Sequence, residues 1–275
     1  MRGGGRDGVV LRDLPGASEH AGATSGEADS FGLDLEFRDQ VAPVFRWLHD
    51  HYWRVKLTGV RHLPATGPAI LIANHSGALP FDGAMICTAI DAAAGIVVRY
   101  LYDRFVANVP MVDSFYRKTG GAVATRDNAR ALLEAGQHVL IFPEGVPGVA
   151  KPFDQRYQLR PFSPGFARMA VETGAVVIPI AVLGAEEIYP IVGRAEAIGR
   201  SLGMPYVPIT PFFPLLGVLG ALPLPTKWFI RIGHPIAVGA IDDEMRARAE
   251  ASKARRKVQA MVTRLRRRRR SVFFG

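Results

Sequence analysis

Short apolar runs alternate with amphipathic segments along most of this chain. The runs begin at Ala69, at Val139 and at Val176, and each is short and set off by glycine, proline or polar residues, as expected of a buried strand. Between them lie segments with the three- and four-residue spacing of amphipathic helices, at 82–94, 125–136 and 164–173. This alternation predicts an α/β fold with a mainly parallel central sheet flanked by helices and joined by right-handed crossovers.

The remaining elements follow from shorter patterns. A helix is expected over 37–52, where Pro43 predicts a kink or a late start and Trp47 and Trp53 add a wide aromatic surface. That surface is suited either to packing against the core or to contact with a membrane interface. Further strands are expected at 55–57, 96–98, 122–123 and 228–232, and further helices over 100–116, broken at Pro110, and from Asp242 onward.

Length and composition suggest three parts. Residues 1–30 are rich in glycine, alanine, serine and acidic residues and have no apolar run, so we expect a disordered leader. Residues 31–262 have enough apolar content for a single full-sized domain. Residues 263–275 form a polybasic tail.

Charge and cysteine content limit the partners and the compartment. The net charge of +9 and the pI near 10.0 favour an anionic partner such as a membrane, a nucleic acid or a phosphate-bearing substrate. Cys87 is the single cysteine, so an internal disulfide and a cysteine-based zinc site are both excluded. No apolar segment of a secretory signal follows the early arginines, and a cytoplasmic location is therefore expected.

Candidate chemistry lies where the first buried strand ends. His75 follows the run AILIAN, and Asp82 comes after a turn that contains Gly77 and Pro80. In open α/β sheets, ligands bind at the carboxyl ends of the strands. A carboxylate that holds one ring nitrogen makes histidine an effective general base, although by spacing alone Asp82 is equally suited to capping a helix.

Two segments favour lipid. Residues 201–226 have no charged side chain, but their six prolines argue against a spanning helix. This segment is expected to enter one leaflet, to wall an apolar groove, or to be a buried irregular part of the core. The Arg264–Arg270 tail is suited to an anionic membrane surface, and the apolar Val272-Phe273-Phe274 that follows favours a membrane over nucleic acid. A tail that is merely solvated is an equally open alternative.

Four blocks in order carry a family resemblance. They are NHSGALPFD at 74–82, GGAVATR at 120–126, IFPEG at 141–145 and VIPIAV at 177–182. In this order they resemble the glycerolipid acyltransferases, the family of lysophosphatidic acid acyltransferase. The resemblance spans about residues 55–183. It implies a membrane-associated O-acyltransferase of phospholipid biosynthesis, working at the cytoplasmic face of the membrane as a peripheral or monotopic protein.

The resemblance also implies roles for individual residues. His75 would be the general base on an acceptor hydroxyl and Asp82 would orient it. Arg126 would bind the acceptor phosphate, and Glu144 with Gly145 would line the acceptor site. The alternatives are that Arg126 is an exposed charge at a helix start, and that Glu144 satisfies backbone groups or pairs with Arg126. The other residues expected to bind substrate are Asn74, Ser76 and Gly121. No metal and no cofactor is implied, since acyl-CoA or an acyl carrier protein thioester serves as co-substrate.

Two departures from the family pattern leave the acceptor open. Six residues rather than four separate His75 from Asp82, and Ser163 stands where the family has a lysine. Lys151, Arg156 or Arg160 are the basic residues nearby in the sequence that are suited to replace it. A lysophospholipid, above all lysophosphatidic acid, is the expected acceptor, and a neutral acceptor such as diacylglycerol or a fatty alcohol is the alternative.

Two other classes of function account for less of the sequence. A serine hydrolase would require a Gly-x-Ser-x-Gly elbow, which the chain lacks. A non-catalytic protein that binds anionic membranes through its arginines would explain the tail but not the four ordered blocks.

Overall fold

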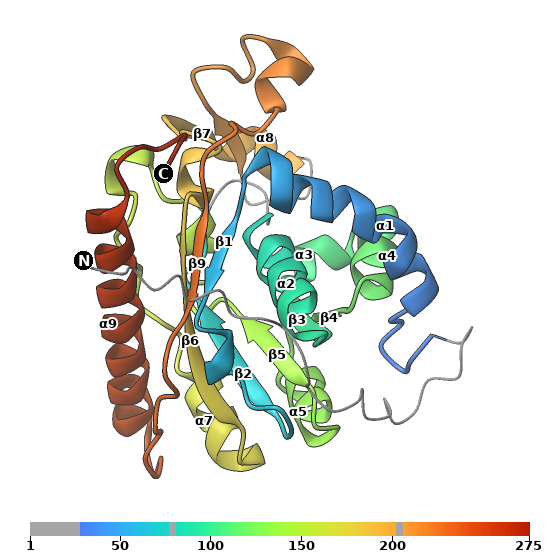
Figure 1. Ribbon diagram of the computed structural model, residues 1–275, viewed down its shortest axis with the longest axis vertical. Coiled ribbons are helices and arrows are strands. Elements are labelled where there is room, and N and C mark those ends of the chain that lie inside the picture. The colour runs from blue at the N-terminus through green and yellow to red at the C-terminus, as the bar shows by residue number, and fades with distance from the viewer. Residues whose placement is uncertain (1–27, 77–80, 202–205) are drawn as a thin grey trace, which may run out of the picture.

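A computed structural model describes residues 28–76, 81–201 and 206–275. Its core is a seven-stranded sheet in the order β1-β9-β6-β2-β5-β3-β4, shown in Figure 1. All its neighbouring strands pair in parallel except β6 and β9. The predicted fold class is therefore confirmed.

The strands are β1 Lys56–Thr58, β2 Ala69–Ala73, β3 Val98–Tyr102, β4 Gly121–Val123, β5 His138–Ile141, β6 Val176–Leu183, β7 Gly193–Ala195, β8 Val207–Ile209 and β9 Phe229–Ile232. The helices are α1 Leu35–Trp47, α2 Phe81–Ala94, α3 Arg104–Ala107, α4 Pro110–Lys118, α5 Arg126–Glu134, α6 Val146–Val149, α7 Gly165–Thr173, α8 Glu196–Ser201 and α9 Glu244–Arg268.

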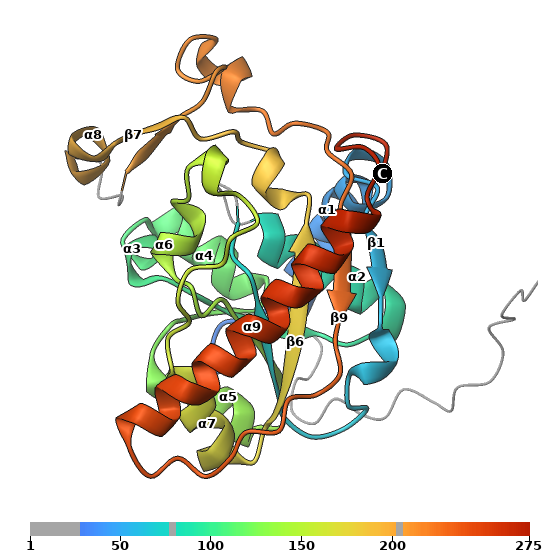
Figure 2. The same ribbon diagram turned by 90° about the vertical axis from the view of Figure 1, so that its left-hand side faces the viewer.

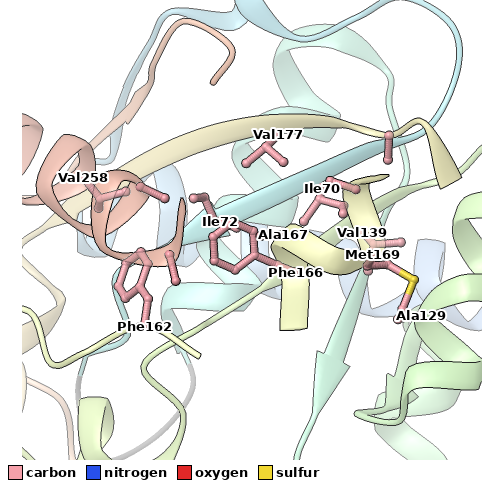
Figure 3. Close-up of a cluster of buried hydrophobic side chains, with 14 of the residues drawn as sticks. Ile70, Ile72, Ala129, Val139, Phe162, Phe166, Ala167, Met169, Val177 and Val258 are labelled. Atoms are coloured by element: carbon pink, nitrogen blue, oxygen red, sulfur yellow. The ribbon is translucent and has the colours of Figure 1, made fainter. Parts of the chain in front are cut away.

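The central strand β2 is buried on both faces, as its uninterrupted apolar sequence predicts. Ile70 and Ile72 face one apolar cluster, which α5, α7 and α9 complete, while Leu71 faces a second cluster beneath α1 and α2. Figure 1 shows α9 on one side of the sheet and α1 with α2 on the other. Figure 3 shows the first cluster, with Ile70 and Ile72 next to Phe166 and Ala167 of α7.

The strand predicted at 96–98 lies instead at Val98–Tyr102, and the helix expected from Tyr100 begins at Arg104. The strand continues through the charged residue Arg99. Arg99 is 1% exposed, pairs with Asp29 and donates to the backbone oxygen of Gly120 at 2.8 Å. A buried arginine that is paired with the partly exposed Asp29 thus allows the strand to continue.

The described fold includes residues on both sides of the range 31–262. Asp29 pairs with Arg99, so the folded part begins before residue 30; residues 1–27 lie outside the described residues. At the other end, α9 continues to Arg268, whereas the polybasic segment was expected to leave the domain at 263. The helix continues because Val262 and Leu265 still pack against the core.

The uncharged stretch is not a single element. It holds β8, which pairs with β7, and a short 3-10 helix at Gly217–Ala221, and Figure 2 shows it standing away from the sheet. Neither β7 nor α8 was predicted, because both are short and lack a clear period. Among the helices of the described ranges, none is long and apolar enough to cross a membrane.

Candidate active site

The site lies where β2 and β5 end side by side. Ile72 of β2 is paired in register with Ile141 of β5, so the residues that follow each strand emerge next to each other. These residues are His75 after β2 and Glu144 after β5. The parallel register therefore brings together two blocks that are about seventy residues apart in the sequence.

His75 and Asp82 are in direct contact. The Nδ1 atom of His75 lies 2.7 Å from Oδ2 of Asp82, a carboxylate that is fully buried. The same carboxylate accepts the backbone N–H groups of Ser76 at 2.9 Å and Gly83 at 2.8 Å. Because an ionised carboxylate only accepts, His75 donates from Nδ1 and Nε2 keeps its lone pair. The six-residue spacer between His75 and Asp82 therefore still allows the two side chains to meet. Residues 77–80 of that spacer lie outside the described residues.

Two further contacts hold His75. Its ring stacks on Phe142 with centroids 4.1 Å apart and planes 19° from parallel. The backbone N–H of His75 donates to Oε1 of Glu144 at 2.9 Å. With a side chain 15% exposed, His75 is fixed by its surroundings yet reachable from solvent. Such an imidazole is suited to accept a proton at Nε2.

Glu144 is a structural centre of the site rather than an exposed lining residue. Its side chain is fully buried; besides His75 it accepts the backbone N–H of Arg160 at 2.6 Å and lies 3.4 Å from Nζ of Lys151. Lys151, itself 3% exposed, lies 2.6 Å from Glu186. Burial raises the pKa of the Glu186 carboxyl, and Lys151 opposes that rise. The sequence predicted Glu144 near the site but not this buried network, because Lys151 and Glu186 come from separate loops with no common motif.

Asn74 and Ser76 support the strand end on which His75 sits. The Asn74 amide donates to the carbonyl of Val182 at 3.0 Å and accepts its N–H at 2.8 Å, which ties β2 to β6. Ser76 is 1% exposed and its backbone N–H binds Asp82. Direct contact of either residue with substrate stays a prediction.

Glycines allow close approach around the site. Gly121 of β4 is buried, and a Cβ there would lie 2.8 Å from the Tyr100 ring and 2.9 Å from the Tyr116 carbonyl oxygen. Gly145 adopts a φ of 59°, which turns the chain after Glu144. Gly148 of α6, which the sequence did not single out, lies against both Glu144 and His75. Substrate contacts of Gly121 and Gly145 stay predictions.

Arg126 is placed elsewhere. It begins α5, its side chain is 67% exposed, and it pairs with Glu172 near the end of α7. In the part of the chain that the structure describes, no hydrogen bond or ion pair joins Arg126 to His75, Asp82 or Glu144. The structure therefore does not bring it together with the pair, and its phosphate-binding role stays a prediction.

The remaining feature of the site is the arrangement of possible metal ligands. Within the described ranges, no group of three or more histidine, cysteine, aspartate or glutamate side chains is arranged to hold a metal ion.

Comparison with known proteins agrees with this geometry. The family model named Acyltransferase matches residues 54–183, which include every block around the site. An uncharacterized protein of Mycobacterium leprae is 39% identical over 256 residues, covering 90% of this chain and 70% of that protein. The 1-acyl-sn-glycerol-3-phosphate acyltransferase alpha of Mus musculus is 26% identical over 144 residues, which cover 50% of this chain and 47% of that enzyme.

A solved structure has the same fold. The crystal structure of the 1-acyl-sn-glycerophosphate (LPA) acyltransferase PlsC from Thermotoga maritima matches with a TM-score of 0.57. The match covers 86% of this chain and 81% of that one at 21% identity. The chain belongs to the acyltransferase family and is an acyltransferase. Membership implies an acyl donor and a lipid acceptor.

Proposed function

We propose that the protein transfers a fatty acyl group from a thioester donor to a hydroxyl of a glycerolipid at a membrane surface. The first acceptor to consider is lysophosphatidic acid or another lysophospholipid, the substrate class in the names of the Mus musculus relative and the Thermotoga maritima enzyme. The donor is acyl-CoA or an acyl carrier protein thioester. The single observation that carries the proposal is the 2.7 Å contact between His75 Nδ1 and the buried Asp82 carboxylate.

The proposed chemistry needs only these two side chains and the substrates. Nε2 of His75 takes the proton of the acceptor hydroxyl as the oxygen attacks the thioester carbonyl. Asp82 stabilises the imidazolium that forms. When the tetrahedral intermediate collapses, the C–S bond breaks and the imidazolium returns its proton to the leaving thiolate. The products are the oxygen ester and the free thiol, and the enzyme ends unchanged.

A neutral acceptor is a second candidate because of where the cations lie. A phosphate group would be expected to contact a free cation near His75. Lys151 is buried and already faces Glu144 and Glu186, while Arg126 pairs with Glu172. Arg156 lies over the Phe153 and Tyr157 rings, and the Arg160 side chain binds Gln155. A diacylglycerol or fatty alcohol would not require such a cation.

The test is acyl transfer from a radiolabelled long-chain acyl-CoA, and separately from an acyl carrier protein thioester. The acceptors are lysophosphatidic acid, other lysophospholipids, diacylglycerol and a fatty alcohol. His75→Ala is expected to abolish transfer, and Asp82→Asn to reduce kcat by a factor on the order of 10³ to 10⁴, as seen for the comparable triad carboxylate. Normal transfer by His75→Ala would reject the mechanism.

Acceptor choice is read from the same panel. If lysophosphatidic acid is acylated and Arg126→Gln raises only its KM, Arg126 binds the phosphate. If Arg126→Gln changes nothing and neutral acceptors are preferred, the second candidate holds. In either case the His75 variant separates catalysis from acceptor binding.

A further inference from the structure

A projection at the active-site edge exposes an apolar surface. We define the apolar projection as residues 206–225. In the sequence it lies between β6 and β9. Strand β6 pairs with β2, the strand that precedes His75, and the last residue of β6, Leu183, pairs with Phe229 at the start of β9. The projection therefore rises from the edge of the sheet at which His75 lies, as the top of Figure 1 shows. Its exposed large apolar side chains are Ile209, Phe212, Leu215, Leu216, Leu219 and Leu222.

Exposure of this kind requires an explanation. Leu215 is 83% exposed and Leu219 is 72% exposed, and the sequence from 201 to 226 has no charge to solvate them. A contiguous apolar patch on a soluble surface marks an interaction site. Because these leucines are exposed, the alternative that the segment is a buried irregular part of the core does not account for them.

The base of the projection is fixed to the domain. The Tyr52 hydroxyl donates to the Pro223 carbonyl, and Trp53 Nε1 donates to the Leu224 carbonyl at 3.1 Å. Trp47, which is half exposed, stacks on Tyr52 with centroids 5.8 Å apart. Trp47 and Tyr52, two amphipathic aromatic side chains, therefore lie beside the base of the projection. Such residues are favoured at a membrane interface.

The C-terminal residues join the same surface. The backbone N–H of Lys227 donates to the Val272 carbonyl at 2.8 Å, and the Arg54 guanidinium donates to the carbonyls of both Pro225 and Phe273. These contacts hold residues 272–273 against residues 225–227, which lead from the projection into β9. Phe274 nevertheless remains 89% exposed. The chain thus places an aromatic ring outward next to the apolar leucines.

At this end of α9, exposed arginines lack a carboxylate partner in the described part of the chain, whereas several cations near the start of the helix have one. Near its start, Arg246, Arg248 and Lys253 each pair with a carboxylate on the same helix or just before it. Arg269 is buried against Glu187 and anchors the helix end. Across the described residues, no carboxylate pairs with the exposed Arg267, Arg268 or Arg270.

We propose that the apolar projection, Phe274 and the free arginines Arg267, Arg268 and Arg270 together dock on an anionic lipid bilayer. The leucines would enter the acyl region while the arginines contact headgroups, a combination of apolar burial and charge attraction that is typical of interfacial binding. His75 lies at the same edge, so an acceptor would reach it without leaving the membrane. The last point rests on the proposed function, whereas docking itself does not.

The test is flotation of the full chain with protein-free vesicles in the absence of substrate. Vesicles of phosphatidylcholine alone are compared with vesicles that contain phosphatidylglycerol. Wild type is expected to prefer the anionic vesicles. Arg267→Gln with Arg268→Gln and Arg270→Gln should weaken that binding on the order of a hundredfold, since each arginine near the surface contributes roughly a factor of five. Leu215→Asp with Leu219→Asp should abolish binding to both vesicle types.

A matched control changes equal charge at the other end of α9. Arg246→Gln with Arg248→Gln and Lys253→Gln should leave vesicle binding unchanged. Equal loss in this control, or full binding by the leucine variant, would overturn the proposal. So would a wild-type dimer in solution that the leucine variant converts to a monomer, because a second copy would then be the occupant of the surface.

The result is separable from that of the catalytic test. Activity on water-soluble short-chain substrates should survive both surface variants, since neither touches His75 or Asp82. Binding without any acyl transfer would keep the docking surface and reject the proposed function. Acyl transfer without vesicle binding would keep the proposed function and reject the docking surface.

Discussion

Glu144 binds the backbone of His75, and this contact defines how the site is held. Its Oε1 accepts the His75 N–H at 2.9 Å while Oε2 accepts the Arg160 N–H at 2.6 Å. The carboxylate is fully buried, so both of its oxygens are used by the protein. The residue that follows the Phe-Pro pair of the third block thus connects the end of β2 to the loop before α7.

Replacement of Glu144 by glutamine should lower kcat rather than raise KM. The amide has only one acceptor oxygen for two backbone donors, so one of those N–H groups loses its partner at a cost of about 1 to 3 kcal/mol. If that cost is felt in the placement of His75, kcat falls by roughly ten- to hundredfold. Steady-state kinetics with varied acceptor measures the two constants separately. A raised acceptor KM at unchanged kcat would instead assign Glu144 to direct acceptor contact.

Removal of the Lys151 charge should destabilise the fold strongly. Lys151 lies between Glu144 and Glu186, and Lys151→Met would leave two buried carboxylates without their cation. Breaking a buried ion pair in this way costs about 3 to 5 kcal/mol. Urea unfolding followed by circular dichroism gives the free energy of unfolding.

A double variant serves as the control for Lys151. Lys151→Met combined with Glu186→Gln removes one charge of each sign, so it should be more stable than Lys151→Met alone. Equal stability of the single and double variants would show that the charges of Lys151 and Glu186 are not coupled.

The Cys87 thiol should resist alkylation in the native protein. Burial raises its pKa from 9.0 to about 12. Because the thiolate is the reactive form, the reactive fraction at pH 8 falls from about one in ten to about one in ten thousand. Iodoacetamide labelling followed by mass spectrometry should therefore be slow in buffer and fast in denaturant. Between pH 8 and 11, the native rate should rise about tenfold per pH unit. Rapid labelling at pH 8 without denaturant would contradict the raised pKa.

The sequence predicts the parts of the fold that are set by local periodicity. β2, β5 and β6 follow from their apolar runs, and α5 from its spacing and the Thr125 cap, which accepts the Asn128 N–H. The end of β3 was missed because Arg99 is neutralised by Asp29, a partner that no local pattern reveals.

In the candidate site, too, residues that share one sequence block could be predicted, whereas contacts made only by packing could not. His75 and Asp82 could be predicted because both belong to one ordered block. The buried Glu144–Lys151–Glu186 network could not, since only the packing of segments far apart in the sequence joins these three residues. The position of Arg126 also depends on packing, because the angle at which α5 leaves β4 decides which residues its side chain reaches.

Gly148 is expected to control the placement of His75 by its lack of a side chain. A Cβ at this position would lie 2.7 Å from the Glu144 Cβ and 3.0 Å from the His75 Cβ, closer than carbon atoms tolerate. Gly148→Ala must therefore displace α6 or His75, at a cost of about 1 to 3 kcal/mol for overpacking. We expect kcat to fall at least tenfold while the acceptor KM changes little.

Gly239→Ala is the matched control, because a Cβ there meets only the Glu250 carboxylate at an ordinary 3.7 Å and the site is remote. It should leave kcat unchanged. If Gly148→Ala were as active as Gly239→Ala, α6 would have room to move, and the position of His75 would then be fixed by Asp82 and Glu144 alone.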